Sequence, residues 1–320
     1  MSDSCLPPIQ IDGVLEDPSA VRRLIEANGP YYPVQRYVRN DAEHRAISAQ
    51  GPMIIAPNFR GDWAYDRPLI EGAEIFLEHE ALVAAAKRLF DTEHVRPQQV
   101  YCNLTWQLPF HQGNGHTDVP AFRGIDRTRY PIWLLNVMGR SGLFEEERIR
   151  IATAVAWFYE GEDGGFEYWP DGPDRPPRAH QGDIFNTAIV GDNDRMFHRV
   201  MPVGGREGGL LGGMTLDTRL ERVGDDVWRI AAGETTMAEF GWPQLRVSVS
   251  WKAVVYRDDA ERRMVDSHER DIDLDDVLER FAADLDARGV AFRVPSTPLD
   301  DPEFVAVLSS TYVRDPSVYA

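Results

Sequence analysis

The chain has 320 residues, of which 43% are hydrophobic, enough to bury one sizeable core. Its net charge of −18 repels phosphate backbones and anionic lipid, which disfavours nucleic acid and membranes as partners. The two cysteines, Cys5 and Cys102, lie far apart, and the N-terminus shows no basic or apolar leader. These features favour a cytoplasmic protein without a disulfide framework.

The first 97 residues are predicted to form a helix-rich flank. An N-capped helix is expected from Asp17 to Gly29, because Asp17 and Pro18 precede an amphipathic run that ends at a glycine. A second helix is expected over 79–91 (HEALVAAAKRLFD), where apolar residues recur on one helical face.

The central region, residues 98–256, is predicted to be a β core. Its short segments are rich in β-branched and aromatic residues, alternate in polarity, and are separated by Gly, Pro, Asp and Asn. The expected strands lie within 99–109, 151–160, 165–170, 183–190, 195–203 and 245–256. This pattern favours a double-sheet jelly roll or a barrel.

Two helices are expected at the end of the chain, over 274–289 and 301–312, within a C-terminal helical extension that spans 257–320. No internal repeat or low-complexity segment is visible, and no boundary is sharp enough to define a second domain. The sequence therefore predicts one domain, 1–320, mainly β with flanking helices.

The segment GNGHTDVPAFRG, residues 113–124, places a histidine and a carboxylate two positions apart. His116 and Asp118 can reach one metal ion if they lie at a strand end and in its loop. His116 is the only one of the eight histidines with a carboxylate at the i+2 position. In so acidic a chain this triplet by itself is equally explained as a polar turn.

A second histidine ligand is expected from elsewhere in the fold, and His198 is preferred. It lies in the strand-like run RMFHRVMPV, where alternation puts Met196, His198 and Val200 on one face. His180 competes, but it stands in a proline-rich, turn-like stretch. A buried structural role for His198 remains the other interpretation.

Two predicted strands, one before and one after the metal motif, offer polar side chains for binding a cofactor. Alternation puts Arg246, Ser248 and Ser250 on one face of the last predicted strand, and an arginine fork binds carboxylates in a bidentate manner. Asn103 lies on the polar face of the 99–109 strand, where it is expected either to hydrogen-bond a cofactor or metal ligand or to meet solvent.

Taken in order, H-x-D, a distal His in a strand and R-x-S in a later strand resemble the Fe(II)/2-oxoglutarate-dependent dioxygenase superfamily. The resemblance implies a double-stranded β-helix, a form of jelly roll. It also implies Fe(II) held by the catalytic residues His116, Asp118 and His198, and 2-oxoglutarate held through its distal carboxylate by Arg246 and Ser248.

The resemblance further implies an enzyme that uses O2 and 2-oxoglutarate to oxidise a C–H bond of a small molecule, releasing succinate and CO2. Hydroxylation is the default outcome, while desaturation, cyclisation and epoxidation stay open, as do secondary metabolism and amino-acid modification. Asp118 argues against halogenation, because related halogenases lack this carboxylate. No motif indicates the oligomeric state.

One departure from the family pattern concerns Arg246, which follows His198 by 48 positions (246 − 198). Residues 204–243 would then form an insertion between two neighbouring strands, either a mobile flap or an ordinary β excursion. Three other cations are therefore kept as alternatives to Arg246 in this part of the chain: Arg219, Arg222 and Lys252.

Substrate contacts are expected at Phe122, Arg123 and Trp169, which lie near the predicted metal loop and strand, although Trp169 before Pro170 also suits a packed corner. Two other functions remain open. A cupin-like metalloenzyme would use the same ligands without 2-oxoglutarate. A non-catalytic jelly-roll module would bind a sugar or a partner through aromatic side chains such as Tyr168, Trp169 and Trp242.

Overall fold

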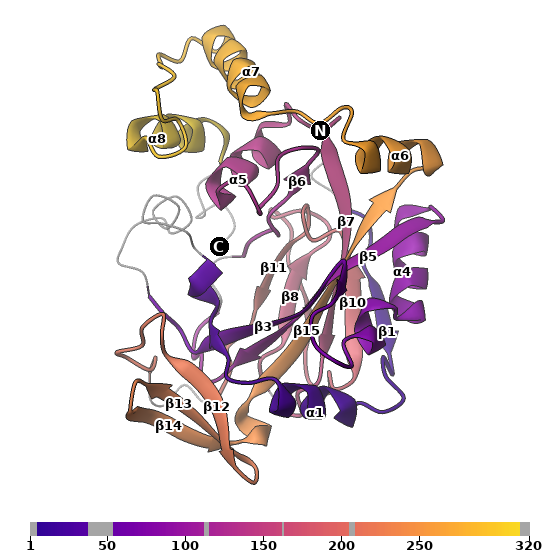
Figure 1. Ribbon diagram of the computed structural model, residues 1–320, viewed down its shortest axis with the longest axis vertical. Coiled ribbons are helices and arrows are strands. Elements are labelled where there is room, and N and C mark those ends of the chain that lie inside the picture. The colour runs from indigo at the N-terminus through magenta and orange to yellow at the C-terminus, as the bar shows by residue number, and fades with distance from the viewer. Residues whose placement is uncertain (1–4, 38–53, 112–114, 162, 205–208, 314–320) are drawn as a thin grey trace.

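The computed structural model describes residues 5–37, 54–111, 115–161, 163–204 and 209–313. Within these ranges the strands form three antiparallel sheets. The large sheet (Figure 1) has the following order: β1 (Ile9–Asp12), β10 (Thr187–Gly191), β7 (Arg148–Trp157), β15 (Arg246–Tyr256), β5 (His94–Thr105), β3 (Asn58–Tyr65) and β2 (Tyr32–Pro33). Two short strands extend it, β4 (Arg67–Pro68) beside β3 and β6 (Ala121–Phe122) beside β7.

The small sheet has the order β11 (Phe197–Val200), β8 (Phe166–Trp169) and β9 (Arg178–His180). The chain passes repeatedly between the two sheets: β7 is in the large one, β8 and β9 in the small one, β10 in the large, β11 in the small and β15 in the large. This alternation is the winding of a double-stranded β-helix, so the predicted fold class, mainly β with flanking helices, is confirmed.

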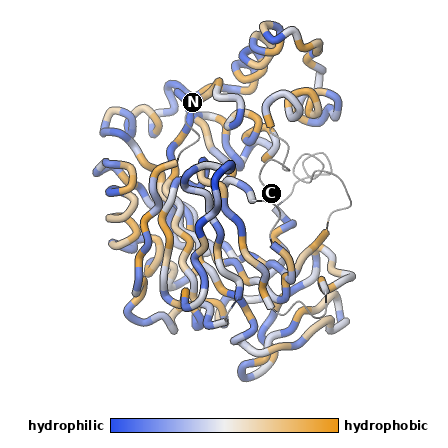
Figure 2. Tube along the Cα trace, turned by 180° about the vertical axis from the view of Figure 1, so that it is seen from behind, coloured by the Kyte–Doolittle hydropathy of each residue, from blue (hydrophilic) through white to orange (hydrophobic). Residues whose placement is uncertain are grey.

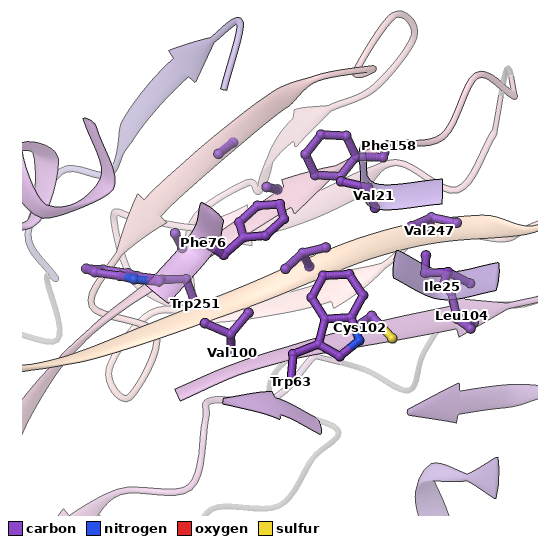
Figure 3. Packing of buried hydrophobic residues seen from close by; sticks show 14 of the residues in the cluster. Val21, Ile25, Trp63, Phe76, Val100, Cys102, Leu104, Phe158, Val247 and Trp251 are labelled. Carbon is purple, nitrogen blue, oxygen red and sulfur yellow. The ribbon is translucent and has the colours of Figure 1, made fainter. Parts of the chain in front are cut away.

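Helices cover the outer face of the large sheet. They are α1 (Ser19–Ala27), α3 (Glu74–Leu77) and α4 (Glu80–Phe90). Alternate residues of β5 and β15, among them Cys102 and Trp251, point outward and pack against side chains of α1 and α3 in one hydrophobic cluster (Figure 3). The same alternation directs the polar residues of both strands to the inner face. Figure 2 shows this change between apolar and polar residues along the strands.

A second hydrophobic cluster lies at one end of the molecule (top of Figure 1). It is built largely from α5 (Ile132–Ser141), α7 (Leu274–Ala287) and α8 (Pro302–Tyr312), and α6 (Asp259–Ser267) precedes α7 in the chain. The predicted helices at both ends of the chain are present within two residues or so of their expected bounds, whereas α5 and α6 were not predicted. α5 begins with an unbroken apolar run, Ile132 to Leu135, that suits a buried strand equally well, and α6 is short and mostly polar.

The N-terminal segment is less helical than predicted, because β1 to β4 come from it and join the large sheet. β1 (IQID) alternates in polarity over only four residues, and β2 and β4 are only two residues long, so none of these three strands has a period of two over a longer run. Their pairing depends on partners far along the chain, as in Ile9 opposite Val190. Between them lies a short 3-10 turn, η1 (Val34–Tyr37).

The segment 204–243 is a β excursion. Outside residues 205–208, which the structure does not describe, it forms a meander of β12 (Arg219–Gly224), β13 (Val227–Ala232) and β14 (Thr235–Gly241), followed by η2 (Trp242–Gln244). The expectation that it separates two neighbouring strands is wrong. His198 lies on the small sheet and Arg246 on the large one, so the chain must cross between layers at this point.

Among the described residues, no helix is long and apolar enough to cross a membrane. Cys5 and Cys102 are free thiols.

Candidate metal centre

A short backbone contact brings the two predicted histidine ligands together. The amide of His116 donates to the carbonyl of His198 (3.0 Å), and the amide of His198 donates to the carbonyl of His116 (2.9 Å). This isolated antiparallel bridge extends the small sheet beyond β11. The two imidazole rings therefore lie side by side, with centroids 4.5 Å apart.

Asp118 completes a group of three. One ligand atom from each of His116, Asp118 and His198 lies within 4.8 Å of the other two, a spacing that one metal ion can bridge. The amide of Asp118 donates to the carbonyl of Asn193 (2.8 Å), which fixes the loop after His116 against the loop before β11. Gly113 and Asn114, at the start of the motif, lie outside the described residues.

The side chain of His198 presents one defined nitrogen to the group. Its Nδ1 lies 3.0 Å from the carbonyl oxygen of Met196, and its Nε2 lies 3.6 Å from Oδ1 of Asp118. A hydrogen bond on Nδ1 leaves Nε2 as the lone-pair donor, the usual arrangement for a metal-bound histidine. The competing His180 lies elsewhere, with its Nε2 2.8 Å from Oγ1 of Thr187.

The two oxygens of Asp118 have different surroundings. Oδ2 accepts hydrogen bonds from Nζ of Lys252 (2.6 Å) and Oγ1 of Thr153 (3.2 Å), while Oδ1 faces His198. Burial disfavours the charge on this carboxylate, but the charge of the Lys252 ammonium and its hydrogen bond outweigh burial. They hold the pKa of Asp118 well below its usual range, so the ligand is ionised at neutral pH.

His116 is neutral at physiological pH. Loss of hydration beside the cavity wall disfavours the charged imidazole and lowers the pKa of His116 to about 3, and the adjacent His198 ring adds to this effect. The residue is nevertheless exposed, because it borders a cavity into which solvent reaches. Two imidazoles and one carboxylate form the donor set that a divalent transition metal needs, and each imidazole binds through a ring nitrogen that carries no proton.

The three ligands line a cavity of about 180 Å³ between the two sheets. Its walls come from the inner faces of β5, β15 and β7, from β8 and β11, and from the start of β3. The predicted alternation is confirmed on this inner face, where the lining includes Tyr101, Asn103, Thr105, Arg246, Ser248 and Ser250.

Arg246 is a buried cation with spare donors. Only 2% of it is exposed, its Nε donates to the carbonyl of Gly164, and Nη1 lies 3.4 Å from Oγ of Ser248. Nη2 is buried without any hydrogen-bond partner among the described residues. Burial lowers the pKa of Arg246 to about 10, and the guanidinium remains charged at neutral pH. A buried charge with an unused donor is costly unless an anion completes it.

A glycine makes room for this arginine. Gly164 adopts φ +66°, and a Cβ at that position would come within 2.7 Å of Cδ of Arg246. The glycine pair before β8 therefore has a specific steric role. Asn103, on the neighbouring strand, donates through Nδ2 to Oγ of Ser250 (3.4 Å), so its amide lies in the same polar wall.

The three predicted substrate contacts do not line the cavity. Phe122 is buried in the helical cluster, and Arg123 points to Met264, with Nη1 3.1 Å from its sulfur. Trp169 is 6% exposed and packs over Gly115 in the metal loop. These residues lie near the metal ligands in sequence but not in the cavity. β6 turns toward the helical cluster, and the Trp169 ring packs against Gly115 instead of facing the cavity. Arg219 and Arg222 pair with acidic residues outside the cavity.

The polar residues around the cavity that were not predicted as site residues include Arg60, Thr153 and Asn193, and Lys252, which contacts Asp118, was expected only as an alternative to Arg246. Lys252 continues the Arg246, Ser248, Ser250 alternation by one further step, so the period of two already contained that signal. Thr153 lies in a strand that reads as apolar. Asn193 reaches the site only through the loop before β11.

No protein-family model matches the chain, and no curated protein matches it in sequence. Solved structures with a similar fold include a prolyl hydroxylase from Trichoplax adhaerens in complex with a hypoxia inducible factor peptide. The TM-score is 0.37 at 11% sequence identity, and the alignment covers 81% of this chain and 87% of that one. Another is HygX from Streptomyces hygroscopicus with nickel, 2-oxoglutarate and hygromycin B bound (0.39, 10%, 79% and 84%). A third is EvdMO1 (0.38, 12%), where 79% of this chain spans 48% of that one, about half its length.

Proposed function

We propose that this chain is an Fe(II)- and 2-oxoglutarate-dependent oxygenase that acts on a small organic molecule, with hydroxylation as the default reaction. One observation carries the proposal. His116, Asp118 and His198 converge at a cavity whose wall also contains a buried guanidinium, Arg246, with an unused donor. The donor set fits iron, and the arginine fits a dicarboxylate.

The ligands would leave one face of the metal open. His116 and His198 would bind through ring nitrogens and Asp118 through Oδ1, because Lys252 and Thr153 already occupy Oδ2. When bound, the iron and 2-oxoglutarate supply the oxidising chemistry, with O2 as co-substrate and succinate and CO2 as products. The protein binds and orients the reactants and restricts water to one enclosed cavity.

Arg246 and Ser248 would hold the distal carboxylate of 2-oxoglutarate. The guanidinium enters from the large sheet, and its Nη1 and Nη2 are available beside Oγ of Ser248. Asn103 would contribute from the adjacent strand, where it already contacts Ser250. This supports 2-oxoglutarate over a cupin-like reaction without it, in which the buried donor Nη2 of Arg246 would have no acceptor.

The test is anaerobic titration of Fe(II) and 2-oxoglutarate, followed by the weak visible metal-to-ligand charge-transfer band. Wild type should develop the band, and His116→Ala and Asp118→Ala should lose it. Arg246→Met should keep Fe(II) binding but require at least about tenfold more 2-oxoglutarate, because hydrogen bonds to a charged group are lost.

A matched control is Arg219→Met, which removes an arginine from the β12–β14 sheet outside the cavity. It should titrate like wild type. A band of equal strength in His116→Ala and Asp118→Ala would exclude the assigned ligands. An Arg246→Met variant with unchanged 2-oxoglutarate affinity would exclude the assigned cofactor contact.

A further inference from the structure

A second arginine, Arg60 on β3, lines the cavity at its other side. In the large sheet Arg60 pairs with Asn103, and Asn103 pairs with Ser248 on its far side. Two strand spacings, roughly 10 Å, therefore separate the backbones of Arg60 and Ser248. The 2-oxoglutarate contacts proposed above leave Arg60 unused.

The guanidinium of Arg60 is fixed in place. Its carbon lies 3.6 Å from the ring centroid of Tyr101 and 4.4 Å from that of Tyr37. Nε and Nη2 donate to Oδ1 of Asp62, at 2.9 and 2.8 Å. The second oxygen of Asp62 accepts from the Tyr37 hydroxyl. Both oxygens of Asp62 thus accept hydrogen bonds, from Arg60 and from Tyr37, while Nη1 of Arg60 has no hydrogen-bond partner in the part of the chain that the structure describes.

Asn58 adds a donor on the same face of β3. Its Oδ1 accepts from Oγ1 of Thr105 (3.0 Å), which leaves the Nδ2 hydrogens as the group it can offer to a ligand. Asn58 and Arg60 are two residues apart in one strand, so both side chains point into the cavity, whose lining includes both.

The charge of the lining supports an anionic ligand. Among the described residues that line the cavity, Asp118 is the only carboxylate, whereas two are arginines, Arg60 and Arg246. Arg60 is already paired with Asp62, so what it adds to the wall is an unused donor on a neutralised ion pair, in a chain with a net charge of −18. Once 2-oxoglutarate occupies Arg246, the donors left for a ligand on β3 are Nη1 of Arg60 and Nδ2 of Asn58, and two such donors recognise an oxyanion.

We propose that Arg60 and Asn58 bind a carboxylate of the substrate, so that the enzyme acts on small carboxylic acids. The inference rests on the proposed function, since it assigns 2-oxoglutarate to the other arginine. Arg60 is a specificity-determining residue in this account. Its fork discriminates an acid from the neutral amide of the same shape, because the amide removes the charge and one acceptor.

The test uses protein loaded with Fe(II) and 2-oxoglutarate without oxygen. A panel of small monocarboxylic acids, from acetate to phenylpropionate and including neutral amino acids, is titrated by calorimetry, each beside its primary amide. Wild type should bind at least one acid at least tenfold more tightly than its amide. Arg60→Met should weaken that acid about ten- to hundredfold and remove the preference, as expected for a lost charged hydrogen bond.

Arg36→Met is the matched control, because Arg36 also stacks on a tyrosine (3.6 Å from the Tyr32 centroid) and pairs with an aspartate, but lies outside the cavity. It should bind acids like wild type. Arg60→Lys should recover part of the preference, since the charge returns without the fork. The charge-transfer band of each variant reports whether the iron and 2-oxoglutarate site is intact.

The outcomes separate the two proposals. Absence of the band in wild type contradicts the proposed function, and the inference with it. A normal band in Arg60→Met together with an unchanged acid preference contradicts this inference alone, as does a panel in which wild type prefers no acid over its amide. If Arg60→Met loses 2-oxoglutarate affinity instead, Arg60 is a cofactor residue and the substrate assignment is wrong.

Discussion

At the scale of single residues, Lys252 has the closest contact with a metal-ligand side chain. Its ammonium lies 2.6 Å from Oδ2 of Asp118, and both side chains are more than four-fifths buried. Breaking such a buried pair is costly because the remaining carboxylate loses its counter-charge. Lys252 therefore positions Asp118 with Oδ1 toward the histidines and keeps it ionised.

The Lys252→Met variant should bind Fe(II) about ten- to hundredfold more weakly, the usual effect of removing a group that orients a metal ligand. Anaerobic Fe(II) titration at neutral pH measures this. Lysine 87, a surface residue paired with Glu93, provides the control, and Lys87→Met should leave the affinity unchanged. Equal affinity in Lys252→Met and wild type would show that Thr153 alone orients the carboxylate.

Asp194 is a buried acid that the proposed reaction does not use. Both of its carboxylate oxygens are buried without a hydrogen-bond partner in the described structure. Burial raises the pKa of Asp194 to about 8, against the opposing effect of Lys252, and the nearby acids Asp118 and Asp192 raise it further. The folded state thus keeps the proton on Asp194 at a pH where the unfolded chain releases it.

This predicts a pH-dependent stability difference in Asp194→Asn. Between about pH 4 and pH 8 folded wild type binds more protons at this position than unfolded wild type, so its free energy of unfolding falls as pH rises. The asparagine variant lacks this loss. Its stability relative to wild type should grow by a few kcal/mol over that window and level off above pH 8. Urea unfolding of metal-free protein at several pH values measures the difference, and a constant difference would contradict the prediction.

At the scale of elements, the β12–β14 sheet is attached to the core but not to the cavity. Trp228 of β13 is fully buried, with its ring 5.9 Å from that of Trp242, and Phe240 of β14 stacks on Trp106 at 4.8 Å. Tyr31 bridges to Leu220 of β12. No described residue of 204–243 lines the cavity. The excursion therefore packs against the sheet core and does not form part of the cavity wall.

Trp228→Ala should therefore lower the free energy of unfolding by about 3–5 kcal/mol, the range for removing a large buried aromatic side chain. The Fe(II) affinity of the folded protein should stay unchanged. Chemical denaturation and Fe(II) titration measure the two effects. Val227→Ala, at a half-exposed position on the same strand, should change stability by less than about 0.5 kcal/mol. A weakened Fe(II) affinity in Trp228→Ala would show that the excursion also supports the metal centre.

At the scale of the whole molecule, the apolar interior is divided between the sheet core and the helical cluster. Phe281 of α7 lies in the second, with ring centroids 5.2 Å from Phe144 and 5.3 Å from Tyr312. Because the clusters are separate, the helical one has the contacts of a cooperative unit that opens by itself.

Phe281→Ala should speed amide hydrogen exchange in α7 and α8 while β15 and β5 keep their protection. The cavity left by the ring destabilises the helices locally, and the sheet core retains its own contacts. Mass spectrometry of peptides from these elements gives the measurement. Exchange that rises equally in β15 would show that the two clusters unfold as one.

The sequence by itself determined what depends on neighbours in the chain. Helical periods located α1, α4, α7 and α8. The β-rich segments of the central region located β5, β7, β8, β10, β11 and β15, and the period of two put Arg246, Ser248 and Ser250 on one face. The spacing of His116 and Asp118, and the strand around His198, were enough to select three residues whose ligand atoms the structure brings together.

Only the tertiary structure decided what depends on distant segments meeting. Arg60 lines the cavity and Lys252 contacts Asp118 because β3 and β15 flank β5 in the large sheet, and the pairing of β5 with β15 joins residues more than a hundred positions apart. Phe122 and Arg123 leave it because the chain turns into the helical cluster directly after the metal loop. Strand pairing and layer crossing are set by the packing of the whole core, and no local period of residues encodes them.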